Sequence, residues 1–153
     1  MVEIKKPQAF VRQIVLYLKN EDYKKAYQLA QGFVSNFPDE MFAHFLLAKA
    51  AFWMERYDEC ISEGRRAFNL AGKEDMAIIA VLMGSAYFKA GRYREGYVFL
   101  SSVRELKDNT DIQTLLFLFS YAQKDRTSAL AHADLLYRMD QRAAITLIEK
   151  FAK

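Results

Sequence analysis

Cysteine, proline, glycine and histidine are scarce in this chain, and each scarcity narrows what the protein can be. The single cysteine, Cys60, excludes an internal disulfide. Two prolines and six glycines among 153 residues leave long stretches free of helix breakers. The two histidines, His44 and His132, lie far apart and in no metal-binding spacing. The sequence therefore carries no sign of a disulfide scaffold or of a metal centre.

Long hydrophobic runs and a concentration of one charge are missing as well. Uninterrupted apolar runs such as Ala77–Met83 and Leu115–Phe119 are far too short to cross a bilayer. The first ten residues contain no apolar signal segment. The net charge of +3 is spread along the chain, without the basic patch that is typical of nucleic-acid binders. We therefore expect a protein of the cytoplasm, or of the nucleus in a eukaryote, that binds neither nucleic acid nor membranes.

Apolar residues at helical spacing are what the sequence has in abundance. Hydrophobic residues make up 52% of the chain, which excludes disorder and is enough for a core. Phe10, Ile14 and Tyr17 show the spacing in the first segment, and Pro38 marks the end of the second. The pattern predicts helices over residues 7–19, 22–37, 40–54, 57–70, 74–90, 93–107, 111–123, 126–139 and 142–151.

One short pattern recurs four times along these predicted helices. An aromatic or long residue is followed by two polar residues and then by a small residue. The four instances are residues 23–26 (YKKA), 57–60 (YDEC), 93–96 (YREG) and 126–129 (RTSA). The pattern thus recurs about every 34 residues, and self-similarity at this period indicates an array of helical hairpins. The small residues, including Cys60, are predicted to let neighbouring helices approach closely.

The segment of residues 84–96, GSAYFKAGRYREG, resembles the central pattern of the tetratricopeptide family. The same pattern is traced by Ala48, Ala51, Tyr57, Cys60 and Ala67 in the second repeat and by Tyr17, Tyr23, Ala26 and Pro38 in the first. The fourth repeat departs from it, because Phe117 fills a small-residue position and Arg126 replaces the turn tyrosine. The resemblance covers residues 7 to about 140.

The resemblance implies one all-α domain over residues 1–153, an α-solenoid of about four tetratricopeptide-like hairpins followed by a capping helix. The predicted repeats are residues 7–38, 39–72, 74–108 and 110–140, and the predicted capping helix is 142–152. In that last helix, Ile145, Ile148 and Phe151 share one face. Covering the apolar end of a repeat stack is the usual role of such a terminal element. A contact of this helix with a second chain is the alternative.

In the tetratricopeptide family the first helix of each pair forms an inner, concave wall. Carried across residue by residue, the predicted partner-binding set is Phe42, Phe45, Lys49, Phe52, Trp53, Ile78, Val81, Ser85, Phe88, Lys89, Leu118 and Tyr121. This mostly apolar lining suits an amphipathic helix or an extended apolar peptide. A clamp for a terminal carboxylate would need a basic and amide lining, and no Asn occupies these positions.

The predicted function is therefore a non-enzymatic scaffold that uses no cofactor and binds a protein or peptide with apolar anchors. One form is a subunit of a larger assembly that also self-associates; the N-terminal segments of the tetratricopeptide subunits of the anaphase-promoting complex are similar in kind. The other is a small chaperone or adaptor for one client segment, as in type III secretion chaperones of this fold. Because large exposed apolar patches are uncommon on monomers, a partner, a second copy or the last helix is expected to cover the lining. In the alternative interpretation, part of this lining belongs to the core between neighbouring repeats.

Overall fold

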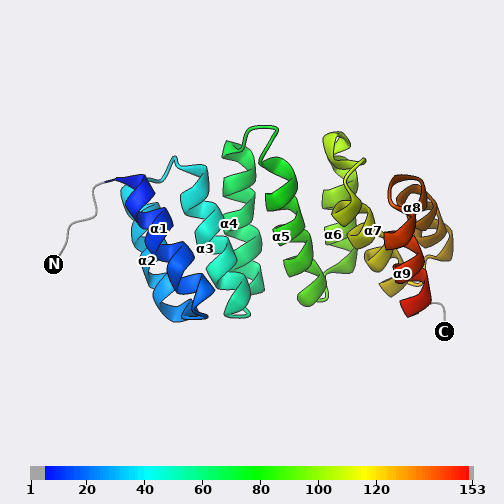
Figure 1. Ribbon diagram of the computed structural model, residues 1–153, viewed down its shortest axis with the longest axis horizontal. Helices are drawn as coiled ribbons and strands as arrows, with labels where there is room; N and C mark the ends of the chain where they lie inside the picture. Colours follow the sequence, from blue (N-terminus) through cyan, green and yellow to red (C-terminus); the bar gives the residue numbers. More distant parts are fainter. Residues whose placement is uncertain (1–5, 152–153) are drawn as a thin grey trace. The chain divides into compact units, whose positions relative to one another are not determined.

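The computed structural model describes residues 6–151, and every regular element within this range is a helix (Figure 1). The elements are α1 (Pro7–Lys19), α2 (Tyr23–Asn36), α3 (Met41–Trp53), α4 (Tyr57–Leu70), α5 (Met76–Lys89), α6 (Tyr93–Ser102), the 3-10 helix η1 (Arg104–Leu106), α7 (Thr110–Ala122), α8 (Arg126–Met139) and α9 (Gln141–Phe151). The predicted all-α class is confirmed. None of these helices is long and apolar enough to span a membrane.

Helix α6 is shorter than the sequence predicts. It ends at Ser102 instead of continuing to about Lys107, and Val103 adopts an extended conformation with φ −98° and ψ 95°. The hydroxyl of Ser101 donates a hydrogen bond to the carbonyl of Tyr97 at 2.7 Å. Serine hydroxyls that bond to nearby backbone compete with the regular helix, so two adjacent serines favour an end at this point.

Each of the four hairpins turns with the same backbone motif. An amide after the turn donates to the carbonyl five residues earlier, at 2.9 Å in every case; the donors are Asp22, Arg56, Arg92 and Asp125. The residue before each donor has a positive φ, between 58° and 74°; these residues are Glu21, Glu55, Gly91 and Lys124. Such a left-handed residue closed by a six-to-one hydrogen bond is a common helix C-terminus. The left-handed residues recur with the same period as the sequence pattern, about 34 residues.

The small residue five positions after each left-handed residue is buried, as predicted. These residues are Ala26, Cys60, Gly96 and Ala129. A Cβ atom added to Gly96 would lie only 2.9 Å from the Cβ of Tyr87 and 2.7 Å from Cε1 of Phe119. Helix α6 therefore packs against its neighbours at a distance that a side chain would prevent. Burial also raises the pKa of the Cys60 thiol to about 12, so this cysteine is an inert packing residue.

The contacts divide the chain into two compact units, Met1–Ala86 and Tyr87–Lys153. In the first unit, the rings of Phe10 and Phe33 are stacked with centroids 4.9 Å apart, and both are buried. In the second unit, a buried cluster of α7, α8 and α9 side chains forms around Leu136. The single domain over residues 1–153 and the repeat boundaries stay predictions.

Helix α9 packs on α8 at the C-terminal end of the second unit (Figure 1). Ala144 and Leu147 are its buried residues, and they join the cluster around Leu136. Ile145 and Ile148 are exposed instead. The helix therefore covers part of the fourth hairpin through a face next to the one that carries the two isoleucines.

We expect Gly96→Ala to lower the free energy of unfolding by about 1–3 kcal/mol, because the new methyl group collides with Tyr87 and Phe119. The matched control is Gly72→Ala, since nothing lies within 4 Å of a Cβ at that position. The control should change the stability by no more than about 0.5 kcal/mol. Urea unfolding followed by circular dichroism measures both changes. Equal stability of the two variants would show that α6 is not packed as closely as described.

Candidate partner-binding surface

Eight predicted binding residues belong to the first unit, and six of them occupy corresponding positions of α3 and α5. Positions 42, 45 and 49 of α3 correspond to positions 78, 81 and 85 of α5. The corresponding pairs, one repeat apart, are Phe42 and Ile78, Phe45 and Val81, and Lys49 and Ser85. These positions follow the helical spacing of three and four residues, so each set lies along one face of its helix.

Three large apolar side chains of this set are exposed. Phe42 is 46% exposed, Trp53 is 51% exposed and Ile78 is 57% exposed. Phe45 is buried, while the remaining members are half-buried: Lys49, Phe52, Val81 and Ser85. The set is therefore a strip of exposed apolar side chains supported by residues that also serve the core. We call the exposed residues Phe42, Trp53 and Ile78 the α3–α5 strip.

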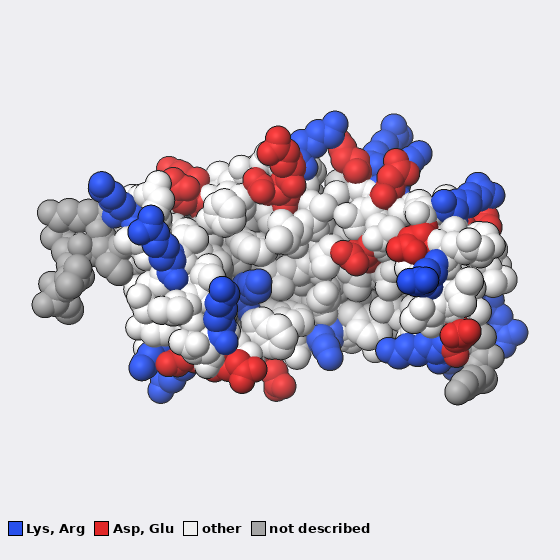
Figure 2. All heavy atoms as spheres, in the orientation of Figure 1, with Lys and Arg blue, Asp and Glu red and all other residues white. Residues whose placement is uncertain are grey.

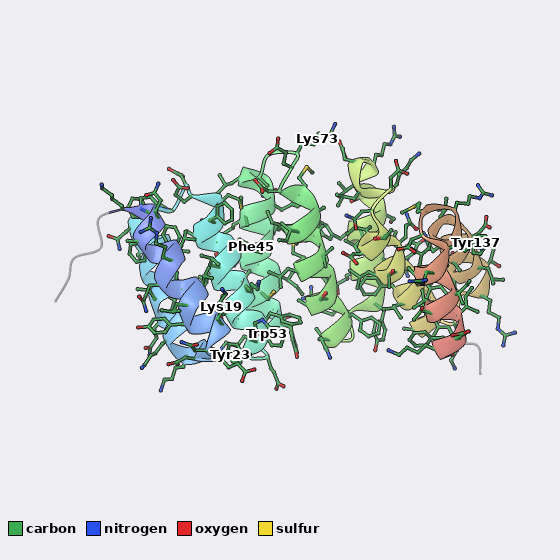
Figure 3. The ribbon with its side chains drawn as sticks, viewed as in Figure 1. Lys19, Tyr23, Phe45, Trp53, Lys73 and Tyr137 are labelled. Atoms are coloured by element: carbon green, nitrogen blue, oxygen red, sulfur yellow. The ribbon has the colours of Figure 1, made fainter. Side chains whose placement is uncertain are left out.

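Trp53 is held in place by two other rings. Its indole stacks on Tyr23 with centroids 5.6 Å apart and an angle of 10° between the planes. Phe52 meets it edge-on at 5.5 Å. Figure 3 shows Lys19, Tyr23 and Trp53 together near one end of α1 and α3. A rigid aromatic side chain loses little conformational entropy when a partner covers it, which is a property of binding hot spots.

Charged side chains avoid the middle of this face. Figure 2 shows mainly uncharged surface over the upper part of α3 and the first part of α5, with most Lys, Arg, Asp and Glu over α1 and at the helix ends. Lys49 is the only charged residue among the eight, and it is half-buried in the middle of α3. Such a surface provides apolar contacts along its length and one positive charge, that of Lys49, at a fixed position.

The other four predicted residues lie in the second unit and do not form one strip. Phe88 is half-buried, and its ring lies 5.8 Å from the buried Phe119. Leu118 packs against the cluster around Leu136. Lys89 and Tyr121 are exposed. Phe88 and Leu118 thus contribute to packing, whereas Tyr121 borders a pocket.

This pocket was not predicted from the sequence. It has a volume of about 810 Å³ and lies between α7, α8 and α9; its lining includes Tyr121, Lys124, Arg126, Leu130, Ile148 and Phe151. Leu130 gave no sign of the pocket in the sequence, because apolar residues also occupy the corresponding positions of the other repeats. The corresponding residues of the earlier second helices are Tyr27, Ile61 and Tyr97, of which the first two are buried and the third is half-buried. Leu130 has the same apolar character but remains exposed.

Both histidines belong to hydrogen-bonded networks. Nδ1 of His44 lies 2.7 Å from Oε2 of Glu63, and its Nε2 lies 2.6 Å from the carbonyl oxygen of Pro38. Glu63 also accepts a hydrogen bond from Arg66 at 3.0 Å. This network ties α3 to α4 and to the segment before α3. It gives His44 a structural role.

His132 joins α8 to α6 and α7. Its Nδ1 lies 2.8 Å from Oε1 of Gln113, and its Nε2 lies 3.0 Å from the hydroxyl of Tyr97. The amide of Gln113 donates to the carbonyl of Lys107 at 2.8 Å, which leaves its Oε1 to accept from the ring. Burial lowers the pKa of His132, and Asp125 opposes this shift in part. The network therefore suits the neutral ring. Within residues 6–151, no group of three or more His, Cys, Asp or Glu could hold a metal ion.

The chain is similar to several known proteins. Residues 5–67 match the family Anaphase-promoting complex, cyclosome, subunit 3. A thermophilic tetratricopeptide protein of Thermus thermophilus is similar in structure, with a TM-score of 0.75, 15% identity, and coverage of 97% of this chain and 83% of that one. YrrB, a tetratricopeptide protein with an unusual peptide-binding site, has a TM-score of 0.68 at 10% identity, with coverage of 92% and 75%.

The chain has the fold of tetratricopeptide-repeat proteins, and the resemblance that the sequence shows to this family is confirmed. MamA from Desulfovibrio magneticus RS-1 is also similar to this chain in structure, with a TM-score of 0.78, 14% identity, and coverage of 90% of this chain and 77% of that one. At such identities the solved structures show the fold alone, an all-α solenoid, and confirm the fold that the sequence predicts. No curated protein sequence matches the chain.

We expect the protein to lose stability on acidification through His132. The folded state disfavours the charged ring, whereas the unfolded chain binds a proton with a pKa near the ordinary value of about 6.5. The unfolded state therefore binds more protons below that pH, and the free energy of unfolding falls as the pH falls toward the lowered pKa. Urea unfolding at about pH 7.5 and about pH 5.5 measures the loss, and His132→Gln should reduce it. A ring that titrates above the ordinary pKa in NMR spectra would contradict this prediction.

Proposed function

We propose that this protein is a non-enzymatic interaction scaffold that binds an apolar helix or an extended apolar peptide of a partner protein on the α3–α5 strip. The exposure of Phe42, Trp53 and Ile78 carries the proposal. These side chains remain exposed although the first unit has a buried core of its own. Exposed apolar patches of this kind mark protein-binding sites on soluble proteins.

Covering the α3–α5 strip can contribute a substantial part of the free energy of binding. Covering one such side chain contributes roughly 1.5–3 kcal/mol, before the costs of association are subtracted. Trp53 is the strongest anchor, because it is aromatic and already held by Tyr23 and Phe52. Lys49 adds one cation, which would pair with a carboxylate of the partner and set its register along α3.

We place this scaffold in a larger assembly, in the cytoplasm or, in a eukaryote, in the nucleus. The match of residues 5–67 to an anaphase-promoting complex subunit family supports the assembly role and covers α1 to α4 except the last residues of α4. YrrB, with its peptide-binding site, supports peptide capture.

Two copies that pair through the same strip would be a self-associating form. The alternative function is a small chaperone that covers the apolar segment of one client until it is assembled or secreted.

The proposal predicts that Ile78→Glu and Trp53→Glu abolish partner capture while the helical content is unchanged. Both side chains are more than half exposed, so a charge is tolerated in the folded chain but not under a partner. The measurement is cross-linked capture from extracts of the source cells, followed by mass spectrometry. Analytical ultracentrifugation of the purified chain tests self-association with the same variants.

The matched control is Val98→Glu on α6, because Val98 is 58% exposed but belongs to a second helix. This control should retain the partners of the wild type. Partners that survive Ile78→Glu and Trp53→Glu would overturn the proposed surface. A monomer that prevents the aggregation of a captured client, without remaining bound in a stoichiometric complex, would favour the chaperone alternative.

A further inference from the structure

Helix α9 occupies the place of the first helix of a fifth pair. First helices begin at Pro7, Met41, Met76 and Thr110, and α9 begins at Gln141, about one repeat further on. It packs on the preceding second helix, α8, as α3 packs on α2 and α7 packs on α6. The regular arrangement thus continues for one helix beyond the fourth hairpin.

In two of the repeats, the second helix of the following pair contacts one particular residue of the preceding second helix. In α2 this residue is Tyr27, whose hydroxyl donates to Glu59 of α4 at 2.6 Å and accepts from Arg56 at 3.1 Å. In α6 it is Tyr97, whose hydroxyl lies 3.0 Å from Nε2 of His132 in α8. Leu130 is the corresponding residue of α8, and it is 70% exposed. The position that a following second helix contacts in two earlier repeats is therefore open here.

The pocket of about 810 Å³ lies at this open position. Leu130 lines it from α8, Ile148 and Phe151 line it from α9, and Tyr121 lines it from α7. The ring of Phe151 lies 5.2 Å from that of Tyr121, which fixes the end of α9 against α7. The pocket is thus built from three packed helices and has apolar walls.

Two cations line the same pocket. Lys124 and Arg126 stand at the turn before α8 and at its first residue, and neither forms an ion pair with any other residue in the described part of the chain. Asp125, between them, is committed to Ser128, because it accepts from the Ser128 amide at 3.1 Å and from its hydroxyl at 2.8 Å. The cations therefore attract negative charge from an occupant of the pocket.

A helix in the place of a fifth second helix would run antiparallel to α9 and hence parallel to α8. Its N-terminus would then lie near the N-terminus of α8, beside Lys124 and Arg126. Acidic residues are favoured in the first turn of a helix, and the second helices α4 and α6 carry them there, at Asp58, Glu59 and Glu95. The charge of the pocket therefore fits the N-terminal end of such a helix.

We propose that the α8–α9 pocket binds an amphipathic helix of a partner protein, which lies parallel to α8, contacts Leu130, Ile148 and Phe151 with its apolar face, and presents acidic first-turn residues to Lys124 and Arg126. A second copy of this chain is a poorer occupant. Its α-helices with acidic first turns are α4, α6 and α7, and each of them already buries apolar residues in the fold. This pocket is separate from the α3–α5 strip and does not depend on the function proposed for the strip.

The test uses a displayed library of amphipathic helical peptides with the first turn and the apolar face randomised. The peptides are about 15 residues long, because shorter isolated helices are marginal in water. The library is selected against the purified full chain. Enriched peptides are expected to carry Asp or Glu in the first turn. The affinity of a synthetic enriched peptide should fall at least about tenfold on Leu130→Glu, and by a similar factor on the double charge reversal Lys124→Glu with Arg126→Glu.

Val98→Glu again serves as a control, and circular dichroism verifies that every variant is folded. Failure to enrich any peptide, or enrichment without acidic first turns, would overturn the proposal. Binding that is lost with Ile78→Glu but retained with Leu130→Glu would assign the peptides to the α3–α5 strip, which overturns this inference and leaves the function proposed for the strip intact. A dimer that Leu130→Glu dissociates would show that a second copy fills the pocket, and this also overturns the proposal.

Discussion

A fixed spacing of five residues, from the left-handed turn residue to the small residue of the next helix, is the constraint on which the structure depends. The turn closes through a six-to-one hydrogen bond of 2.9 Å in all four hairpins. Five residues later the second helix presents a buried small residue to its neighbours. The turn sets where the second helix begins, and the small residue sets how closely that helix can be approached. Because both recur about once every 34 residues, one local rule generates the whole array.

Much of the fold follows from this rule and could be predicted, because the turn and the small position are both visible in the sequence. The bounds of α4 and α8 were predicted correctly for this reason. The end of α6 was not, since it depends on hydroxyl groups that compete for backbone carbonyls, which apolar spacing does not reveal. The binding surface was less predictable. Helix α3 is apolar on nearly all sides, so spacing alone did not separate the buried Phe45 from the exposed Phe42. The pocket was missed because Leu130 has the same apolar character as its buried counterparts, and only the structure shows that Leu130 is exposed.

The repeated architecture also leaves apolar surface exposed to solvent. A stacked hairpin buries part of its apolar surface only when the next hairpin is added, so positions that serve as core in one repeat are open in another. At α8 and α9 this produces a pocket with apolar walls and two cations at one end. Separately, two rings on α3 and an isoleucine on α5 face solvent beside a buried core. Both surfaces suit helical or extended segments of other proteins, and they differ in charge. A scaffold with two such surfaces would join two partners without any chemistry of its own.

The close approach of helices at the small positions is tested most directly by NMR. Nuclear Overhauser effects between the Hα protons of Gly96 and the ring protons of Phe119 report this distance in solution without altering the chain, and Gly64 with Met83 gives the same test in the first unit. Strong effects at both glycines are predicted. Their absence in a folded, helical protein would contradict the packing rule and, with it, the repeated architecture on which both proposed surfaces rest.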